Sequence, residues 1–219
     1  MEIIKGNIEV KREARYYTNG ASPAAADSIW FLLHGYGQLA ENFIKKFKTL
    51  ETGNNLLVAP EALSRFYTDG GFGKIGASWM TREERESEIK GYVDYLSSLF
   101  KYFREECGSR NIPLNVFAFS QGTAAACRWL QLSGIKASIL ILWGGFFPHD
   151  LDSARWKDAF ERLLIVTGTE DNFFTPANLE KGRKQLDDVK ALYDVYVYEG
   201  IHEMSVKEVN HVFKNIVRQ

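Results

Sequence analysis

Short runs of consecutive apolar residues recur along the chain, separated by longer stretches in which apolar and polar residues mix. A continuous apolar run is typical of a strand covered on both faces of a sheet, because none of its side chains faces water. We predict strands of this kind over residues 28–33, 55–60, 113–119, 137–143, 163–167 and 192–198.

The N-terminal pattern is different. Ile3-Ile4 and residues 8–17 predict one or two strands with a turn at Gly6-Asn7, and residues 19–26 predict a loop. The mixed stretches farther along predict helices over residues 40–50, 81–107, 153–160 and 176–189, with two more after Ser120 and after Ser205.

Capping residues mark several of these helix starts. Thr81 with Glu84, and Ser205 with Glu208, have the spacing of a capping box, in which each side chain bonds the other residue's backbone N–H. Thr175 precedes a proline at the first helical position, where the missing N–H costs nothing.

Strands that alternate with helices predict an α/β fold with a mostly parallel central sheet and helices on both faces. No repeat, linker or low-complexity tract divides the chain, so we expect a single domain over residues 1–219. Residues 61–80 are irregular and rich in glycine and aromatic residues, and we expect them to form a small partial cap.

Composition narrows the classes of function. The chain has 219 residues, of which 45% are hydrophobic, and its net charge is −1, which offers no basic surface for nucleic acid or an anionic membrane. No apolar run approaches the roughly 20 residues that span a bilayer, and no signal peptide is evident. Cys107 and Cys127 are the only cysteines, which favours a cytoplasmic protein. Monomer and homodimer both remain open.

The stretch around Ser120 is the strongest chemical signal. It is a strand-like run followed at once by small residues at helical density, with the sequence Ala118-Phe119-Ser120-Gln121-Gly122 at the junction. A serine at such a turn projects its hydroxyl from the sheet edge, as in the G-x-S-x-G nucleophile elbow of α/β-hydrolases. The alternative is an ordinary loop with a capping serine.

Two further residues follow predicted strands. Asp171 comes after the strand ending at Thr167, and His202 comes after the last strand. Ligands of open parallel sheets bind beyond the carboxyl ends of the strands, so we expect Ser120, Asp171 and His202 to meet there. His202 would take the serine proton, and Asp171 would orient the imidazole. Taken singly, Asp171 could instead cap a loop and His202 could be a surface residue.

The loop His34-Gly35-Tyr36-Gly37 supplies candidate donors for an oxyanion hole. A tetrahedral intermediate needs two backbone N–H groups aimed at its oxygen. We assign these to Gln121, directly after the nucleophile, and to Tyr36. His34 precedes this loop rather than following the last strand, so we expect a structural role for it.

These motifs together resemble the phospholipase/carboxylesterase family of α/β-hydrolases, which includes carboxylesterases and acyl-protein thioesterases. The resemblance rests on His34-Gly35-x-Gly37, Phe119-Ser120-Gln121-Gly122, Gly168-x-x-Asp171 and Gly200-x-His202, and covers residues 28–217. It departs from the family pattern at three positions: Ala118 replaces a glycine, Gln38 a frequent aspartate, and Gly144 a common serine.

Aromatic and other apolar residues on segments that reach the carboxyl end of the sheet are candidates for a substrate pocket. The alternative for each of them is ordinary core packing. They are Phe72, Trp79, Met80, Trp143, Phe146 and Phe173, with Phe147 and Phe174 beside them.

These patterns predict a serine hydrolase without metal or cofactor, which cleaves small-molecule carboxylic esters, or alternatively thioesters, through an acyl-enzyme. A peptidase or amidase of the same fold is one alternative. A non-catalytic binding protein on a hydrolase fold is another.

Overall fold

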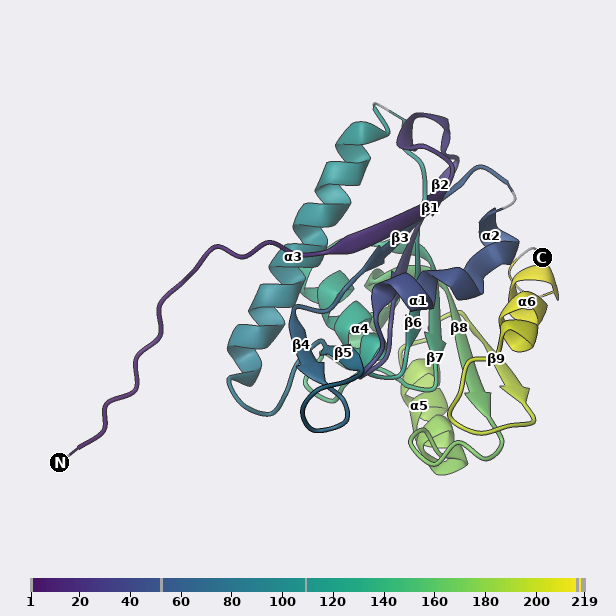
Figure 1. Cartoon of the computed structure of the whole chain (residues 1–219). Helices are drawn as coiled ribbons and strands as arrows, with labels where there is room; N and C mark the ends of the chain where they lie inside the picture. Colours follow the sequence, from purple (N-terminus) through teal and green to yellow (C-terminus); the bar gives the residue numbers. More distant parts are fainter. Residues whose placement is uncertain (1, 52, 109, 216, 218–219) are drawn as a thin grey trace.

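The computed structural model describes residues 2–51, 53–108, 110–215 and 217. Its core is a seven-stranded sheet in the order β1-β3-β2-β6-β7-β8-β9 (Figure 1). Only β1 runs antiparallel to its neighbour, which confirms the predicted mostly parallel sheet. The strands are β1 Tyr16–Gly20, β2 Ser28–Leu33, β3 Asn55–Pro60, β6 Leu114–Phe119, β7 Ala137–Trp143, β8 Phe160–Gly168 and β9 Tyr193–Tyr198.

Helices cover both faces of this sheet, as the alternation of elements predicts. The α-helices are α1 Ala40–Ile44, α2 Lys48–Glu51, α3 Arg85–Glu106, α4 Gln121–Ser133, α5 Pro176–Asp188 and α6 Val206–Asn215. Three 3₁₀ turns accompany them: η1 Pro23–Ala25, η2 Lys45–Phe47 and η3 Ser153–Asp158.

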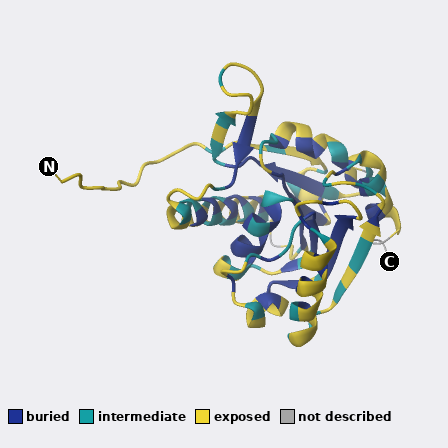
Figure 2. Cartoon of the chain, turned by 90° about the horizontal axis from the view of Figure 1, so that it is seen from below, coloured by how far each residue is buried: buried dark blue, intermediate teal, exposed yellow. Residues whose placement is uncertain are grey.

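Strand β2 shows why the apolar runs are continuous. Ile29, Phe31 and Leu33 pack into one hydrophobic cluster, together with side chains of α3, α4 and α5. Trp30 and Leu32 point to the opposite face and pack with α1 and α6. Successive strand residues alternate between faces, and both faces are buried, so the run from Ile29 to Leu33 is apolar throughout (Figure 2).

The N-terminal strands predicted before Tyr16 are wrong. Residues 2–15 have no regular structure and run as an extended segment past α3 (Figure 1). Arg15 attaches the end of this segment to the rest of the chain. Its carbonyl accepts hydrogen bonds from the Glu61 backbone N–H at 2.9 Å and from the Tyr95 hydroxyl at 2.9 Å. Before it, Ile8 and Val10 keep a strand-like alternation, but they are 87% and 78% exposed because no strand lies beside them.

Residues 61–80 contain an antiparallel hairpin that the sequence pattern missed. Its strands are β4 Ser64–Tyr67 and β5 Ile75–Ser78, and they form a separate two-stranded sheet. An isolated bridge between Gln38 and Ala77 ties this hairpin to the loop after β2. The hairpin therefore lies next to the candidate oxyanion loop.

The helix starts agree only in part with the predicted capping residues. α3 begins at Arg85 rather than Thr81, and Glu84 adopts a left-handed conformation with φ of 50°, so the first capping box is wrong. At α6, Ser205 Oγ accepts the Glu208 N–H at 3.2 Å, but the Glu208 carboxylate binds the Tyr196 hydroxyl instead of returning to Ser205. The cap of α5 is confirmed, with Thr175 Oγ1 accepting a backbone N–H and proline following.

Within the described ranges, no helix is both long and apolar enough to cross a bilayer.

Candidate active site

Ser120 occupies a strained turn between β6 and α4. Its φ of 52° and ψ of −119° lie outside the regions that a residue with a Cβ usually adopts. Two backbone bonds hold the turn: the Ser120 N–H donates to the Trp143 carbonyl at 2.8 Å, and the Thr123 N–H donates to the Ser120 carbonyl at 3.0 Å. The turn directs the Ser120 side chain away from the helix, toward the loop after β9.

Gly122 explains why the residue two positions after Ser120 must be small. A Cβ built there would lie 2.6 Å from the Leu33 carbonyl oxygen and 2.7 Å from that of His34. The first turn of α4 thus packs directly on the backbone at the end of β2, which agrees with the close approach expected at the elbow.

The structure brings Ser120, His202 and Asp171 into one hydrogen-bonded line. Ser120 Oγ lies 2.8 Å from His202 Nε2, and His202 Nδ1 lies 2.7 Å from Asp171 Oδ2. Asp171 is 3% exposed. Its other oxygen, Oδ1, accepts the backbone N–H groups of Phe173 at 2.8 Å and Phe174 at 2.7 Å, so the carboxylate is held on both sides. The neighbouring Glu170 is exposed.

The His202 ring is enclosed by three neighbours. The Phe119 ring stacks on it at 5.2 Å between centroids, and Phe173 lies at 4.8 Å. Gly144 closes the third side: its φ is 62°, and a Cβ there would lie 2.9 Å from His202 Cε1. A serine at this position would therefore displace the imidazole, which gives the departure at Gly144 a structural reason.

The loop after β2 leaves one backbone donor without an acceptor. The Gly35 N–H binds Gln38 Oε1 at 2.9 Å, the Gln38 N–H binds the Gly35 carbonyl at 3.2 Å, and the Gly37 N–H binds the Ala77 carbonyl at 2.9 Å. The Tyr36 N–H has no acceptor among the described residues, and neither does the Gln121 N–H at the start of α4. A helix N-terminus also carries a partial positive charge, which favours an anion.

His34 lies in the core, 0% exposed. Its Nδ1 is 2.8 Å from the Gly35 carbonyl oxygen and its Nε2 accepts the Ala62 N–H at 3.1 Å, which together require a neutral ring with the proton on Nδ1. Burial lowers the pKa of His34, in keeping with this neutral form. The ring supports the loop rather than facing Ser120, as the sequence analysis expected.

No protein-family model and no curated protein matches the sequence. Solved structures do match its fold. Esterase PE8 has a TM-score of 0.69 and 18% identity, over 94% of this chain and 100% of that one. A phospholipase/carboxylesterase from Dyadobacter fermentans matches with a TM-score of 0.68 and 20% identity, over 96% of this chain and 100% of that one. Acyl-protein thioesterase 2 of Zea mays matches with a TM-score of 0.64 and 16% identity, over 94% of this chain and 99% of that one.

This chain has the α/β-hydrolase fold. The expected fold class is confirmed, and the solved structures include the carboxylesterases and thioesterases that the motifs resemble. At 20% identity or less the likeness concerns the fold alone, and the chemistry depends on this chain's own side chains.

Three of the predicted pocket residues line neither of the two cavities to which Trp79 contributes. Trp143 is wholly buried on the α1 and α6 face, with its Nε1 3.2 Å from the Tyr198 hydroxyl and from the Glu203 carbonyl. Composition alone did not separate this core residue from a pocket residue. Phe72 is fully exposed on the β4–β5 connection, and Phe146 packs against Phe174 and Trp156. The assignment of Trp143 to a pocket is therefore wrong, and those of Phe72 and Phe146 stay predictions.

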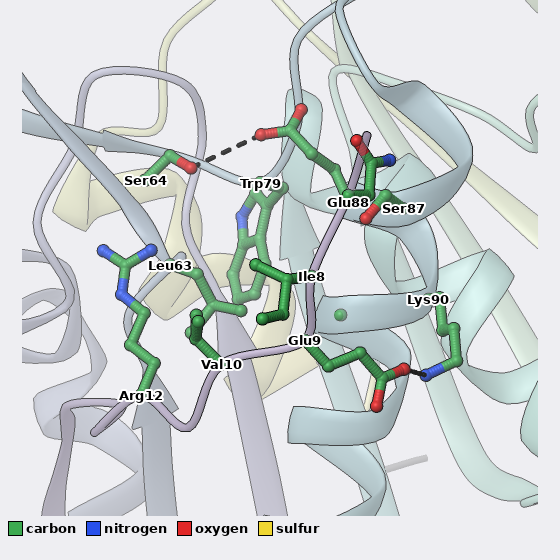
Figure 3. Close-up of a pocket in the computed structure, with 12 residues that line it drawn as sticks. Ile8, Glu9, Val10, Arg12, Leu63, Ser64, Trp79, Ser87, Glu88 and Lys90 are labelled. Carbon is green, nitrogen blue, oxygen red and sulfur yellow. Dashed lines mark hydrogen bonds and ion pairs between the residues drawn. The ribbon is translucent and has the colours of Figure 1, made fainter. Parts of the chain in front are cut away.

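The other three lie nearer the triad, which here means the hydrogen-bonded set Ser120, His202 and Asp171. Phe173 is 78% exposed beside His202. Trp79 and Met80 line a cavity of about 310 Å³ on the side of α4, next to Gln121. Trp79 also stands at the back of a cavity of about 640 Å³ formed with the N-terminal segment and α3, where Figure 3 shows Ile8 and Val10 beside Leu63. That larger cavity contains no member of the triad.

A buried ion pair that no sequence motif indicates lies close to this site. Arg128 on α4 is 5% exposed and binds Asp150 through two parallel bonds, Nε to Oδ2 at 2.9 Å and Nη2 to Oδ1 at 2.8 Å. The feature of the sequence that could have indicated this ion pair is the single arginine among the small and apolar residues of the helix after Ser120. The hydrogen bond from Arg128, with help from Arg85, holds the pKa of Asp150 well below its usual range.

Among the described residues, no group of three or more His, Cys, Asp or Glu side chains is placed to hold a metal ion.

Proposed function

We propose that this protein is a serine hydrolase that cleaves carboxylic esters, thioesters included, through an acyl-enzyme. The observation that carries the proposal is the line from Ser120 through His202 to Asp171, with hydrogen bonds of 2.8 and 2.7 Å, beside two backbone N–H groups that lack acceptors.

In the acylation step, His202 Nε2 takes the Ser120 hydroxyl proton while Oγ attacks the ester carbonyl carbon. The carbonyl oxygen gains negative charge, and the N–H groups of Tyr36 and Gln121 receive it. The imidazolium then returns the proton to the departing alcohol or thiol, which leaves the acyl group on Ser120. Water, activated by the same imidazole, releases the acid in the second half of the reaction.

Asp171 acts on the imidazole and not on the substrate. Its Oδ2 accepts the His202 Nδ1–H, which leaves Nε2 unprotonated and turned toward Ser120. Because Oδ1 is occupied by two backbone N–H groups, the carboxylate cannot rotate away without breaking both bonds.

A fluorophosphonate probe tests the proposal, because it reacts with an activated serine. We expect one adduct, at Ser120, and we expect Ser120→Ala to lose both labelling and turnover of 4-nitrophenyl acetate. Ser133→Ala, on the same helix but far from His202, is the matched control and should behave as the parent. Equal labelling of parent and Ser120→Ala would show that another nucleophile reacts, whereas a parent that takes up no label and hydrolyses no ester would favour a binding protein. Faster turnover of an anilide than of the matching ester would favour a peptidase or amidase.

A further inference from the structure

The cavity of about 310 Å³ beside α4 has the composition of a small ligand site. Its walls are mostly apolar, with contributions from Met80, Tyr92 and Ala124, and Arg128 is the buried cation in it. Its volume is at the lower end of the roughly 300–1,000 Å³ that ligand pockets occupy. Apolar walls with one buried cation suit a short chain that ends in an anion.

Gln121 connects this cavity to the reacting centre. Its backbone N–H is a candidate oxyanion donor, and its side chain lines the cavity. The side chain is fixed by bonds from Nε2 to the Met80 carbonyl at 2.8 Å and from the Trp79 N–H to Oε1 at 3.0 Å. A carbonyl oxygen bound by the Gln121 N–H would therefore lie next to the residue whose side chain forms part of the cavity wall.

The two halves of an ester face different sides of the site. His202 must protonate the departing oxygen, so the alcohol or thiol half lies on the His202 side. The acyl half then lies away from His202, on the side of Gln121 and the cavity. Arg128 is two helical turns beyond Gln121, about 10 Å along the axis. Helix side chains lean toward the N-terminus, which shortens the distance from Arg128 to Ser120.

Arg128 has donor capacity that Asp150 does not use. Nε and one N–H of Nη2 bind Asp150, and Nη1 has only Met80 Sδ at 3.3 Å and the Tyr92 hydroxyl at 3.4 Å. A thioether is a weak acceptor, and 3.4 Å is long for a hydrogen bond. An anionic oxygen in the cavity would be a far better partner for Nη1.

The charge around the cavity also favours an anion. Asp150 is shared, because Arg85 Nη2 lies 2.8 Å from its Oδ2 while Arg128 binds both oxygens. Arg82 lines the same cavity and is exposed. Glu86 offsets part of this charge through its ion pair with Arg85. Glu88 is a third carboxylate nearby, since it accepts the Thr81 N–H. The residues that line the cavity itself nevertheless include two arginines and no acidic side chain.

We propose that this cavity is the acyl subsite and that it selects acyl groups ending in a carboxylate, which binds Arg128 Nη1. The proposal rests on the proposed esterase function. Its substrates would be half-esters of dicarboxylic acids, with the free carboxylate held in the cavity and the ester carbonyl at Ser120.

Three 4-nitrophenyl esters with acyl groups of different ends test this subsite: the monoester of adipic acid, its methyl-capped neutral analogue, and acetate, which is too short to reach Arg128. We expect the parent to hydrolyse the adipate monoester with a kcat/KM about 10- to 100-fold above the capped ester, the range of a charge-assisted hydrogen bond. In Arg128→Met that ratio should fall to about one, with Asp150 still paired to Arg85.

Ala124→Leu fills the cavity without touching the ion pair, and it should lower kcat/KM for both six-carbon esters relative to acetate. Ala177→Leu, on the exposed surface of α5, is the matched control and should leave all three values unchanged. Acetate turnover by the parent without a preference for the free carboxylate, or a preference that survives in Arg128→Met, would overturn the subsite and leave the proposed function intact. Failure to hydrolyse any ester would overturn the proposed function, and the subsite with it.

Discussion

Asp171→Asn is the perturbation whose effect the site geometry predicts most sharply. The asparagine oxygen can still accept the N–H groups of Phe173 and Phe174, so the turn should keep its shape. The amide NH₂ then replaces Oδ2 opposite His202 Nδ1, at 2.7 Å in the parent. An NH₂ group only donates, so Nδ1 must become the acceptor and the ring proton moves to Nε2. His202 then cannot take the Ser120 proton.

We expect kcat for 4-nitrophenyl acetate to fall by up to roughly 10⁴-fold, the loss found for the equivalent change in serine proteases. That corresponds to about 5 kcal/mol of transition-state stabilisation. KM and the thermal midpoint should change little, because the carboxylate does not touch the substrate and asparagine keeps its size and both backbone hydrogen bonds. Glu170→Gln is the matched control, since Glu170 is exposed and adjacent, and it should stay within a few-fold of the parent. A large loss in Glu170→Gln with normal kcat in Asp171→Asn would refute this assignment.

Three further predictions concern residues that hold the active-site loops or the neighbouring ion pair in place. Gly144→Ser should lower kcat about 100-fold, because the new side chain displaces the imidazole. Gly134 also has a positive φ but lies in open space, so Gly134→Ser should keep kcat and lower only the stability, by about 1 kcal/mol in a thermal melt. Equal kcat in both variants would contradict this reasoning. Gln38→Leu frees the Gly35 N–H, and kcat should fall up to about 10-fold at unchanged KM; a rise in KM alone would refute the positioning role. Because the folded-state pKa of Asp150 is lowered, its contribution to stability is present above the usual carboxyl pKa of about 3.9 and is lost as the pH falls below it. Asp150→Asn should therefore unfold in urea more easily at pH 7, by about 3 kcal/mol, and lose less stability than the parent between pH 4 and pH 2; identical acid sensitivity would exclude this pair as the cause.

The sheet could be predicted from the sequence because its strands are buried on both faces. In β7, Leu142 packs with α3 and α4 while Trp143 packs on the other face, and both positions must be apolar. The same logic fails at residues 2–15, where Ile8 and Val10 alternate like a strand but have no partner. Pairing between strands is a long-range property that a local pattern cannot supply.

The meeting of Ser120, His202 and Asp171 could be predicted because chain topology places the ends of parallel strands together. The residues that line the cavities could not be predicted, since the lining depends on the direction of side chains from several elements. Trp143 and Met80 both follow or end a strand, yet one lies in the core and the other on a cavity. Arg128 was overlooked because its partner, Asp150, is distant in sequence and no motif links them.

The most direct test of the central claim is to trap the acyl-enzyme. Parent protein is mixed with 4-nitrophenyl acetate, quenched in acid within the first turnover, digested and analysed by mass spectrometry. The account predicts a burst of nitrophenolate equal to the enzyme concentration and a single acetyl group on Ser120, absent in Ser120→Ala. Turnover with no covalent adduct, or with the acetyl group on another side chain, would contradict it.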